Sequence, residues 1–197
     1  MGLRFEYTAG QTALEEEEKD GLLIKSITTK QELDEFEQKN IEQAIEWTLK
    51  TKLKIDTLLT ENFVKKVHQK MYGEVWSWAG KFRKTNKNIG VDKWSIATDL
   101  KCLLDDTKFW CVNKIYSEDE IAIRFKHRLV SIHCFPNGNG RHSRLIADLF
   151  ISKIFNRPIF SWGEKIAEPK ELRALYLKAL RMADRGDCNS LIEFSRF

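Results

Sequence analysis

The sequence predicts an all-α, mainly helical protein: a bundle of helices with one small β-hairpin. Apolar residues recur at helical spacing along most of the chain, and capping signals precede several of these stretches. Of the 197 residues, 42% are hydrophobic and 11% are aromatic, which is enough to bury a sizeable core in one compact domain. No disulfide or structural metal is needed for such a fold.

Capping boxes predict where two of the helices begin. Thr29 with Glu32, and Ser117 with Glu120, each place a hydroxyl and a carboxylate where they satisfy free backbone N–H groups. Apolar residues at helical spacing follow the first box: Leu33, Phe36, Ile41, Ala44, Ile45 and Leu49. Further helices are expected over residues 60–72, 98–113, 118–132, 141–155, 169–183 and 188–197.

The exception to helical patterning is a polar, asparagine-containing turn at residues 84–88, between two short runs that favour β structure. This pattern predicts a hairpin over about 82–91. Residues 1–28 are polar, with a glutamate run at 15–18, and predict an extended arm. We therefore expect an N-terminal arm and helix over 1–54, with regulation as one role, and a core domain with the C-terminal helices over 55–197.

The charge pattern suits a nucleotide better than a nucleic acid. The formal net charge is +4, and basic residues are interleaved with acidic ones along most of the chain. The four cysteines lack a CxxC pair and are expected to be reduced. No signal-peptide core or membrane span is evident, so a cytoplasmic protein without a membrane partner is expected. Homo-oligomerisation is left open.

One stretch combines the residue types that phosphate chemistry needs: HCFPNGNGRHSR at 133–144. An apolar helix is expected to end at His133, and the glycines that follow let the backbone turn its N–H groups toward an anion. A new helix beginning near Arg141 adds partial positive charge. Arg141 and Arg144 are three residues apart and can reach the same anion. A titratable base beside such a cradle outlines a phosphoryl-transfer site.

This stretch resembles the signature of the Fic family, H-x-F-x-[D/E]-G-N-G-R-x-x-R. Its matching fixed positions are His133, Phe135, Gly138, Asn139, Gly140, Arg141 and Arg144. Upstream, WAGKFR at 78–83 is similar to the family's segment before its target-binding flap, and the expected hairpin falls where that flap belongs. The resemblance covers about 55–160 and implies the Fic fold.

The resemblance implies a protein adenylyltransferase that transfers AMP from ATP to a Ser, Thr or Tyr hydroxyl of a target protein. His133 would be the general base. The nucleotide-binding residues would be Phe135, Gly138, Asn139, Gly140, Arg141 and Arg144. In that set the 138–140 segment forms the anion hole for the α- and β-phosphates, Phe135 anchors the loop, Arg141 holds the β-phosphate and Arg144 contacts the terminal phosphate.

The target-binding flap would use Phe82, Arg83, Asn88, Ile89 and Gly90. By this resemblance the hairpin pairs with the extended backbone of the target, which is β-strand addition.

One position departs from the family pattern: Asn137 stands where the family has the Asp or Glu that holds Mg²⁺. An amide oxygen can ligate Mg²⁺ but brings no charge, and hard cations favour carboxylates. Weaker metal binding is expected to slow transfer or to change which phosphate is attacked.

Many Fic proteins carry an inhibitory glutamate in the pattern [S/T]-x-x-x-E-[G/N], which pairs with the second motif arginine. The segment Thr12 to Glu16 has this spacing, although Glu17 follows. Thr28 to Glu32 also fits, again with a different next residue. We hypothesise that Glu16 restrains Arg144.

Other interpretations of these residues stay open at this stage. His127, His133 and His142 do not have the spacing of a zinc site, and His68 and His127 are expected to be structural or exposed. The fold could serve a transferase that uses another nucleotide or phosphate donor. It could also serve as a weakly catalytic regulator that binds a nucleotide and a partner in a toxin–antitoxin-like role. Nucleic-acid binding is disfavoured by the modest charge.

Overall fold

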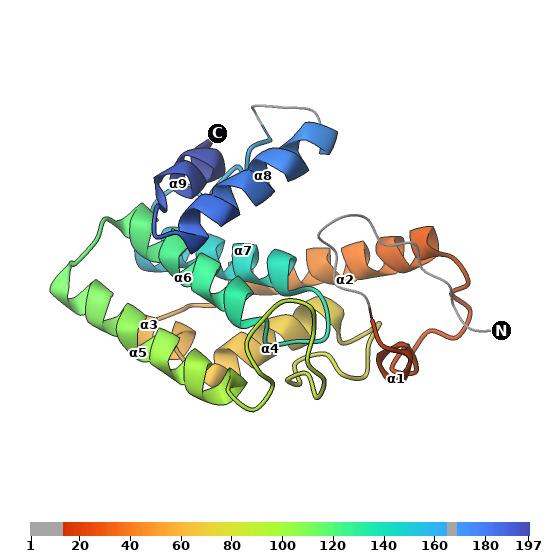
Figure 1. Cartoon of the computed structure of the whole chain (residues 1–197). Helices are drawn as coiled ribbons and strands as arrows, with labels where there is room; N and C mark the ends of the chain where they lie inside the picture. The colour runs from red at the N-terminus through yellow and green to blue at the C-terminus, as the bar shows by residue number, and fades with distance from the viewer. Residues whose placement is uncertain (1–13, 165–168) are drawn as a thin grey trace.

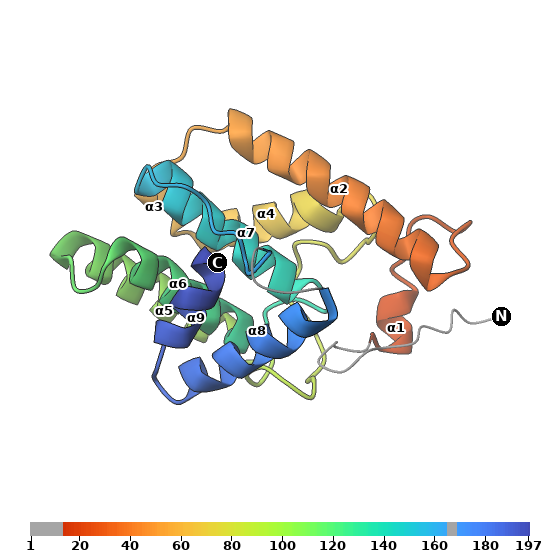
Figure 2. The ribbon, with the colours of Figure 1, turned by 90° about the horizontal axis from the view of Figure 1, so that it is seen from above.

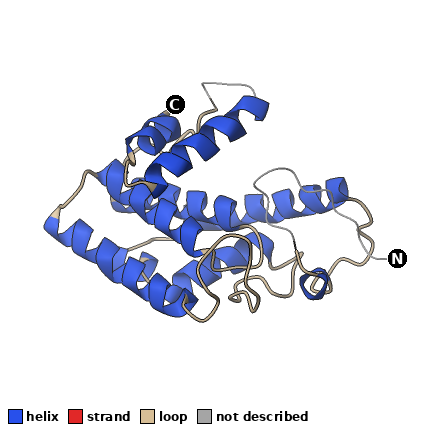
Figure 3. Cartoon of the chain, viewed as in Figure 1, coloured by secondary structure: helices blue, strands red, loops and turns tan. Residues whose placement is uncertain are grey.

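The computed structural model describes residues 14–164 and 169–197, and this part of the chain is built of helices and loops without a β-strand (Figures 1 and 3). The expected helical class is therefore confirmed. None of the described helices combines the length and apolar character needed to cross a membrane. Residues 1–13 of the expected arm lie outside the described part.

The helices in chain order are α1 (Glu16–Lys19), α2 (Lys30–Lys50), α3 (Ile55–Leu58), α4 (Glu61–Tyr72), α5 (Ile96–Asn113), α6 (Glu118–Ile132), α7 (Asn139–Leu149), a π-helical turn (Phe150–Ile154), α8 (Pro169–Asp184) and α9 (Asn189–Arg196). The expected division of the chain at residue 54 falls in the link between α2 and α3, and it stays a prediction.

Helix α7 lies in the middle of the bundle (Figures 1 and 2). It packs against both α6 and α4, while α2 lies along α4 and α5 lies along α6. Helices α8 and α9 pack on each other, and α9 also contacts α6. The start of α7, which carries the predicted phosphate cradle, is consequently supported from several sides.

Helix α4 turns a partly polar face toward the motif. Its buried residues are Phe63, Val64, Val67, His68, Met71 and Tyr72. The hydroxyl of Thr60 caps the helix by accepting the Phe63 N–H at 3.1 Å. Buried polar groups need hydrogen-bond partners, and His68 and Tyr72 find theirs in the turn between α6 and α7.

Helix α2 begins with the predicted capping box, in which the Thr29 hydroxyl accepts the Glu32 N–H at 3.2 Å and the Glu32 carboxylate accepts the Thr29 N–H at 3.0 Å. The apolar stripe that was expected along it is only half buried. Leu33, Ile41 and Ala44 are in the core, whereas Phe36, Ile45 and Leu49 are exposed. The buried stripe instead includes Glu37, which lies between Leu33 and Ile41 and is 5% exposed.

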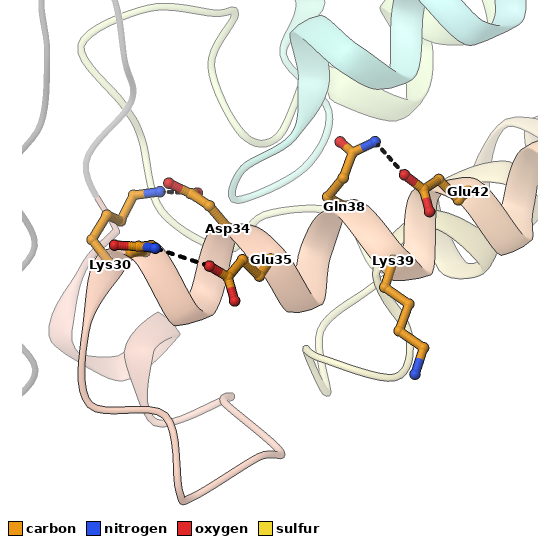
Figure 4. Close-up of a pocket in the computed structure, with 7 residues that line it drawn as sticks. Lys30, Asp34, Glu35, Gln38, Lys39 and Glu42 are labelled. Carbon is orange, nitrogen blue, oxygen red and sulfur yellow. Dashed lines mark hydrogen bonds and ion pairs between the residues drawn. The ribbon is translucent and has the colours of Figure 1, made fainter.

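The polar face of α2 borders a shallow, open hollow of about 740 Å³ (Figure 4). Its lining residues are Lys30, Gln31, Asp34, Glu35, Gln38, Lys39 and Glu42. Their side chains bind one another along the helix, Gln31 to Glu35 and Gln38 to Glu42, each at 3.0 Å. Pairs of this kind are typical of a solvated helix surface, so we assign the hollow no function.

The predicted hairpin is wrong: residues 82–91 form a loop without paired strands, and the isolated β-bridge of the described residues joins Leu22 to Trp76. The backbone N–H groups at both ends of the loop bind carbonyls at and just after the end of α6 instead of pairing with the opposite strand. The N–H of Arg83 donates to the Cys134 carbonyl at 2.9 Å, and the N–H of Val91 donates to the Ile132 carbonyl at 3.3 Å. These contacts use the backbone donors that a hairpin would need.

The Arg83 side chain completes the loop by binding carbonyl groups that strands would have paired. Its guanidinium donates to the Thr85 carbonyl at 2.8 Å and also to the Val91 carbonyl. Helix α1 holds the middle of the loop, because Lys87 forms an ion pair with Glu18 and the Thr85 hydroxyl donates to the same carboxylate at 3.1 Å. The loop is thus fixed by a buried arginine and an ion pair.

Candidate functional site

His133 ends α6 in a left-handed backbone conformation, with φ of 58°. Its N–H donates to the Leu129 carbonyl at 3.3 Å, and its carbonyl accepts the Arg83 Nε–H at 2.7 Å. Histidine is among the non-glycine residues that tolerate this region, which closes helices by turning the chain away from the axis. The bend directs the chain from α6 into the turn that leads to α7.

The loop 82–91 covers His133, which is 5% exposed. Gly90, with φ of 101°, lies so close that a Cβ there would be 2.6 Å from the His133 Cβ. Burial, with the nearby Arg83 and Lys87 cations, lowers the pKa of His133 to about 4. The imidazole is therefore neutral near pH 7, which is the form that can accept a proton.

Phe135 fixes the turn in the core. It is fully buried, and its ring stacks on His68 with centroids 3.8 Å apart. Asn139 braces the same turn, because its side chain accepts the Phe135 N–H at 3.0 Å and donates to the Phe135 carbonyl at 2.8 Å. The Asn139 side chain thus shapes the loop, and the group of this residue that remains for a ligand is its backbone N–H.

His68 joins three segments through its two ring nitrogens. Nδ1 accepts the Gly80 N–H at 3.0 Å, so Nε2 carries the proton and donates to the Asn137 carbonyl at 3.0 Å. Burial lowers the pKa of His68 well below its usual value, which keeps it neutral. His142 makes a similar bond from α7 to the Val64 carbonyl at 2.9 Å. These bonds hold the turn against α4.

The start of α7 is shaped for an anion. Gly138, the N-cap, has φ of 78°, and a Cβ there would be 2.6 Å from the Tyr72 ring. A helix start leaves backbone N–H groups without intrahelical acceptors, and glycine has no side chain to cap them. A Cβ at Gly140 would meet no atom within 4 Å. Backbone donors and open space therefore coincide at this terminus.

Both arginines of the motif lie on aromatic rings. The Arg141 guanidinium lies 5.2 Å from the Tyr72 ring centroid, and the Arg144 guanidinium lies 5.5 Å from that of Tyr176 on α8. Stacking on a ring limits the directions that a guanidinium can take. Arg141 also donates to the Glu37 carboxylate at 2.7 Å. The first two turns of α7 thus present two oriented cations.

The structure leaves the Glu16 hypothesis without a supporting contact. Glu16 is on the outside of α1 with its side chain 81% exposed, and it forms an ion pair with Lys19. The carboxylate bound to a motif arginine is Glu37, and the arginine is Arg141, not Arg144. The pattern segment that precedes Glu16 begins at Thr12, outside the described residues.

Comparison with known proteins places this geometry in a family. Residues 58–151 match the model of the Fic/DOC family. Residues 58–151 thus correspond to a Fic domain. A protein adenylyltransferase Fic from Drosophila grimshawi is 27% identical over 141 residues, which is 69% of this chain and 28% of that protein. The corresponding protein from Aedes aegypti is 23% identical over 158 residues, 78% of this chain and 30% of the relative.

Solved structures share the fold. Fic-1 from C. elegans (aa134–508) matches with a TM-score of 0.65 at 21% identity, over 80% of this chain and 46% of that one. The BepC protein from Bartonella tribocorum, a VirB-translocated effector solved with bound AMPPNP, matches with a TM-score of 0.66 at 15% identity. That match covers 88% of this chain and 89% of BepC. At these identities the likeness establishes the fold alone.

The Fic domain offers little of its own to a metal ion. The Asn137 amide oxygen accepts the Gly138 N–H at 2.6 Å. Among the described residues, no group of three or more His, Cys, Asp or Glu side chains could hold a metal. Mg²⁺ in proteins is usually bound by one or two carboxylates together with substrate phosphates and water. The donor set at Asn137 does not fit a resident metal.

Several residues that support the Fic motif were missed from the sequence: Glu37, Tyr72, Trp76 and Tyr176. His68 was expected to be structural or exposed, and it is fully buried. The sequence signal that could have revealed Glu37 is a charged residue on an apolar helix face, since Glu37 interrupts the stripe from Leu33 to Ile41. His127, by contrast, binds Asp184 at 2.8 Å, away from the motif.

Gly90→Ala tests the close packing of the loop on His133. The added methyl group would clash with the His133 Cβ, so we expect the loop to move and the imidazole pKa to rise from about 4 toward 6.5. Gly186→Ala is the control, because Gly186 also has a positive φ, of 95°, but a Cβ there meets no atom within 4 Å. NMR titration of His133 measures the effect; the same pKa in both variants would contradict the packing argument.

Stability should depend on pH through the buried histidines. The pKa of His142 is lowered to about 4, mainly by burial, while the unfolded chain titrates near the ordinary value of 6.5. The stabilisation is thus complete above about pH 6.5 and is lost as pH falls to about 4. The shift corresponds to about 3 kcal/mol for this histidine.

Urea unfolding at pH 7.5 and pH 4.5 measures this loss, with His142→Gln as the comparison. Glutamine keeps a donor for the Val64 carbonyl but does not titrate, so the variant should lose less stability between the two pH values. An equal loss in both proteins would show that His142 does not contribute.

Proposed function

We propose that this chain is a protein adenylyltransferase that transfers AMP from ATP to the hydroxyl of a Ser, Thr or Tyr on a target protein. The observation that carries the proposal is the position of a neutral imidazole, His133, at the start of a short turn that ends in an uncapped helix N-terminus with two oriented arginines. The names of the curated relatives support the same reaction. Because the chain spans less than a third of their length, the activity remains our proposal.

In the proposed reaction the nucleotide phosphates lie against the first turn of α7. The backbone N–H groups of residues 138–140 hold the α- and β-phosphates, which requires the Gly138 N–H to leave the Asn137 amide oxygen that it contacts at 2.6 Å. Arg141 holds the β-phosphate and Arg144 the terminal phosphate. Anion binding here needs donors that are already oriented, and the Tyr72 and Tyr176 rings orient the two guanidiniums. Phe135 acts from the core by fixing the turn.

His133 then removes the proton from the target hydroxyl as its oxygen attacks the α-phosphorus. A new P–O bond forms to the target, the bond between the α-phosphorus and its bridging oxygen to the β-phosphate breaks, and pyrophosphate leaves. The proton remains on the imidazole until it passes to solvent. A neutral imidazole is required, and the lowered pKa of His133 supplies it at pH 7.

Access to His133 requires movement of the loop 82–91. The residue is 5% exposed beneath Gly90, so a target hydroxyl reaches the imidazole only when this loop shifts. Exposed side chains on the loop, such as Asn88 and Ile89, would then meet the target together with Phe82. Because no strand edge is preformed, target pairing by strand addition would need the loop to reorganise.

Mg²⁺ enters this proposal only as part of the nucleotide complex. Asn137 contributes one neutral oxygen, so the protein adds little to the affinity of phosphates for the ion. For this reason a second candidate function stays in view: a domain that binds a nucleotide and a partner with little or no turnover. A transferase with another nucleotide or phosphate donor would keep the same site and add a different mass.

Replacing His133 tests the reaction. We expect His133→Ala to lower transfer of labelled AMP by about a thousandfold, since general-base catalysis commonly contributes factors of this order. Each of ATP, GTP, UTP and CTP is tested, and intact mass of the modified protein identifies the group added. His127→Ala is the matched control, because that histidine binds Asp184 away from the motif. Undiminished labelling of His133→Ala would exclude the imidazole as base.

Asn137→Asp tests the metal contribution. A carboxylate at this position should bind the ion with its nucleotide, so Mn²⁺ is expected to tighten ATP binding about tenfold in the variant and little in the native chain. Calorimetry with and without Mn²⁺ measures this independently of turnover. If Mn²⁺ strengthened ATP binding equally in both proteins, Asn137 would be as good a ligand as a carboxylate. Transfer by the variant alone would favour the binding function for the native chain.

A further inference from the structure

Glu37 is a buried carboxylate on α2, a helix outside the motif. It is 5% exposed, and it lies in the apolar stripe between Leu33 and Ile41. Burying a carboxylate is costly unless it is paired and hydrogen-bonded. A carboxylate at such a position therefore requires specific partners.

Both oxygens of Glu37 are used. Oε1 accepts the indole N–H of Trp76 at 2.8 Å, and Oε2 accepts an N–H from the Nη2 of Arg141 at 2.7 Å. Trp76 is itself 1% exposed and stacks on Trp78 with centroids 4.9 Å apart. The carboxylate is thus immobilised by an indole that cannot readily move.

The ion pair is asymmetric in a way that suggests its role. The Glu37 side chain is 6% exposed, whereas that of Arg141 is 39% exposed. A guanidinium has several N–H donors, and Glu37 accepts a bond from one nitrogen of Arg141. The Tyr72 ring, whose centroid is 5.2 Å from the guanidinium, supports the group. The buried end of the pair is fixed, and donors on the exposed end are left for a ligand.

We propose that Glu37 is a positioning residue for Arg141: it holds the guanidinium beside the first turn of α7, ready to bind the β-phosphate of a nucleotide. This inference rests on the proposed function, because it assumes that Arg141 binds the β-phosphate. It adds α2 to the phosphate site. A guanidinium that is oriented before binding loses less conformational freedom when the phosphate arrives.

The same carboxylate could have the opposite effect on binding, because its negative charge repels the phosphates. If Glu37 acted as a gate, Arg141 would have to leave it before binding a nucleotide, and removing the negative charge would strengthen binding. If Glu37 positions Arg141, removing its second acceptor oxygen weakens binding. The two roles therefore differ in the sign of one measured quantity.

Glu37→Gln is the informative variant. Glutamine has nearly the same shape but one oxygen, so it can accept from Trp76 or from Arg141 and not from both. We expect the dissociation constant of ADP to rise about tenfold, while that of AMP, which has no β-phosphate, stays unchanged. Isothermal titration calorimetry with ADP and AMP measures both. Glu35→Gln, on the exposed face of α2, is the matched control.

A double-mutant comparison shows whether Glu37 acts through Arg141. In the Arg141→Ala background, Glu37→Gln should leave the affinity for ADP unchanged. Tighter ADP binding by the single variant, equal weakening of AMP and ADP, or a further loss in the Arg141→Ala background would each overturn the proposal.

A measurement on the native chain covers the case in which the variant does not fold. NMR relaxation of the Arg141 Nε–H group should show a rigid side chain before any nucleotide is added, and a mobile one would overturn the proposal. Native protein that binds ADP but transfers no AMP would remove the adenylyltransferase function and leave the role of Glu37 intact. Native protein that binds neither ADP nor ATP would overturn both.

Discussion

The site depends on one bridging imidazole, His68, which links the turn between α6 and α7 to the rest of the bundle. It accepts the Gly80 N–H and donates to the Asn137 carbonyl, and its ring stacks on Phe135. Only the neutral tautomer with the proton on Nε2 can make both bonds. The turn therefore has one position relative to α4, and the backbone N–H groups that follow it point into a defined space.

The remaining parts of the site are supported by separate elements of the bundle. Helix α2 supplies the carboxylate for Arg141, α8 supplies the ring under Arg144, and the loop 82–91 covers His133. The groups suited to bind an anion are backbone amides and cations, and each cation is oriented by residues from outside the motif. Such an arrangement is expected where a charged ligand binds to donors that are oriented before it arrives.

Helices and caps were predictable because they follow from local spacing, as at Thr29 and Ser117. The motif from His133 to Arg144 was also predictable, since its residue types and order are themselves the signal. The loop was not, because Arg83 binds carbonyl groups of Thr85 and Val91 within the loop and that of the distant His133, and these bonds override β-favouring runs. The partner of Arg141 was not predictable either, since α2 lies about a hundred residues earlier in the chain.

Binding of a phosphate chain at the start of α7 is the central claim, and an NMR titration of the native chain with ADP tests it most directly. We expect the largest amide shifts at residues 138–141, with smaller shifts around Glu37 on the buried face of α2. Shifts that cluster elsewhere, with the amides of 138–141 unchanged at saturation, would contradict it.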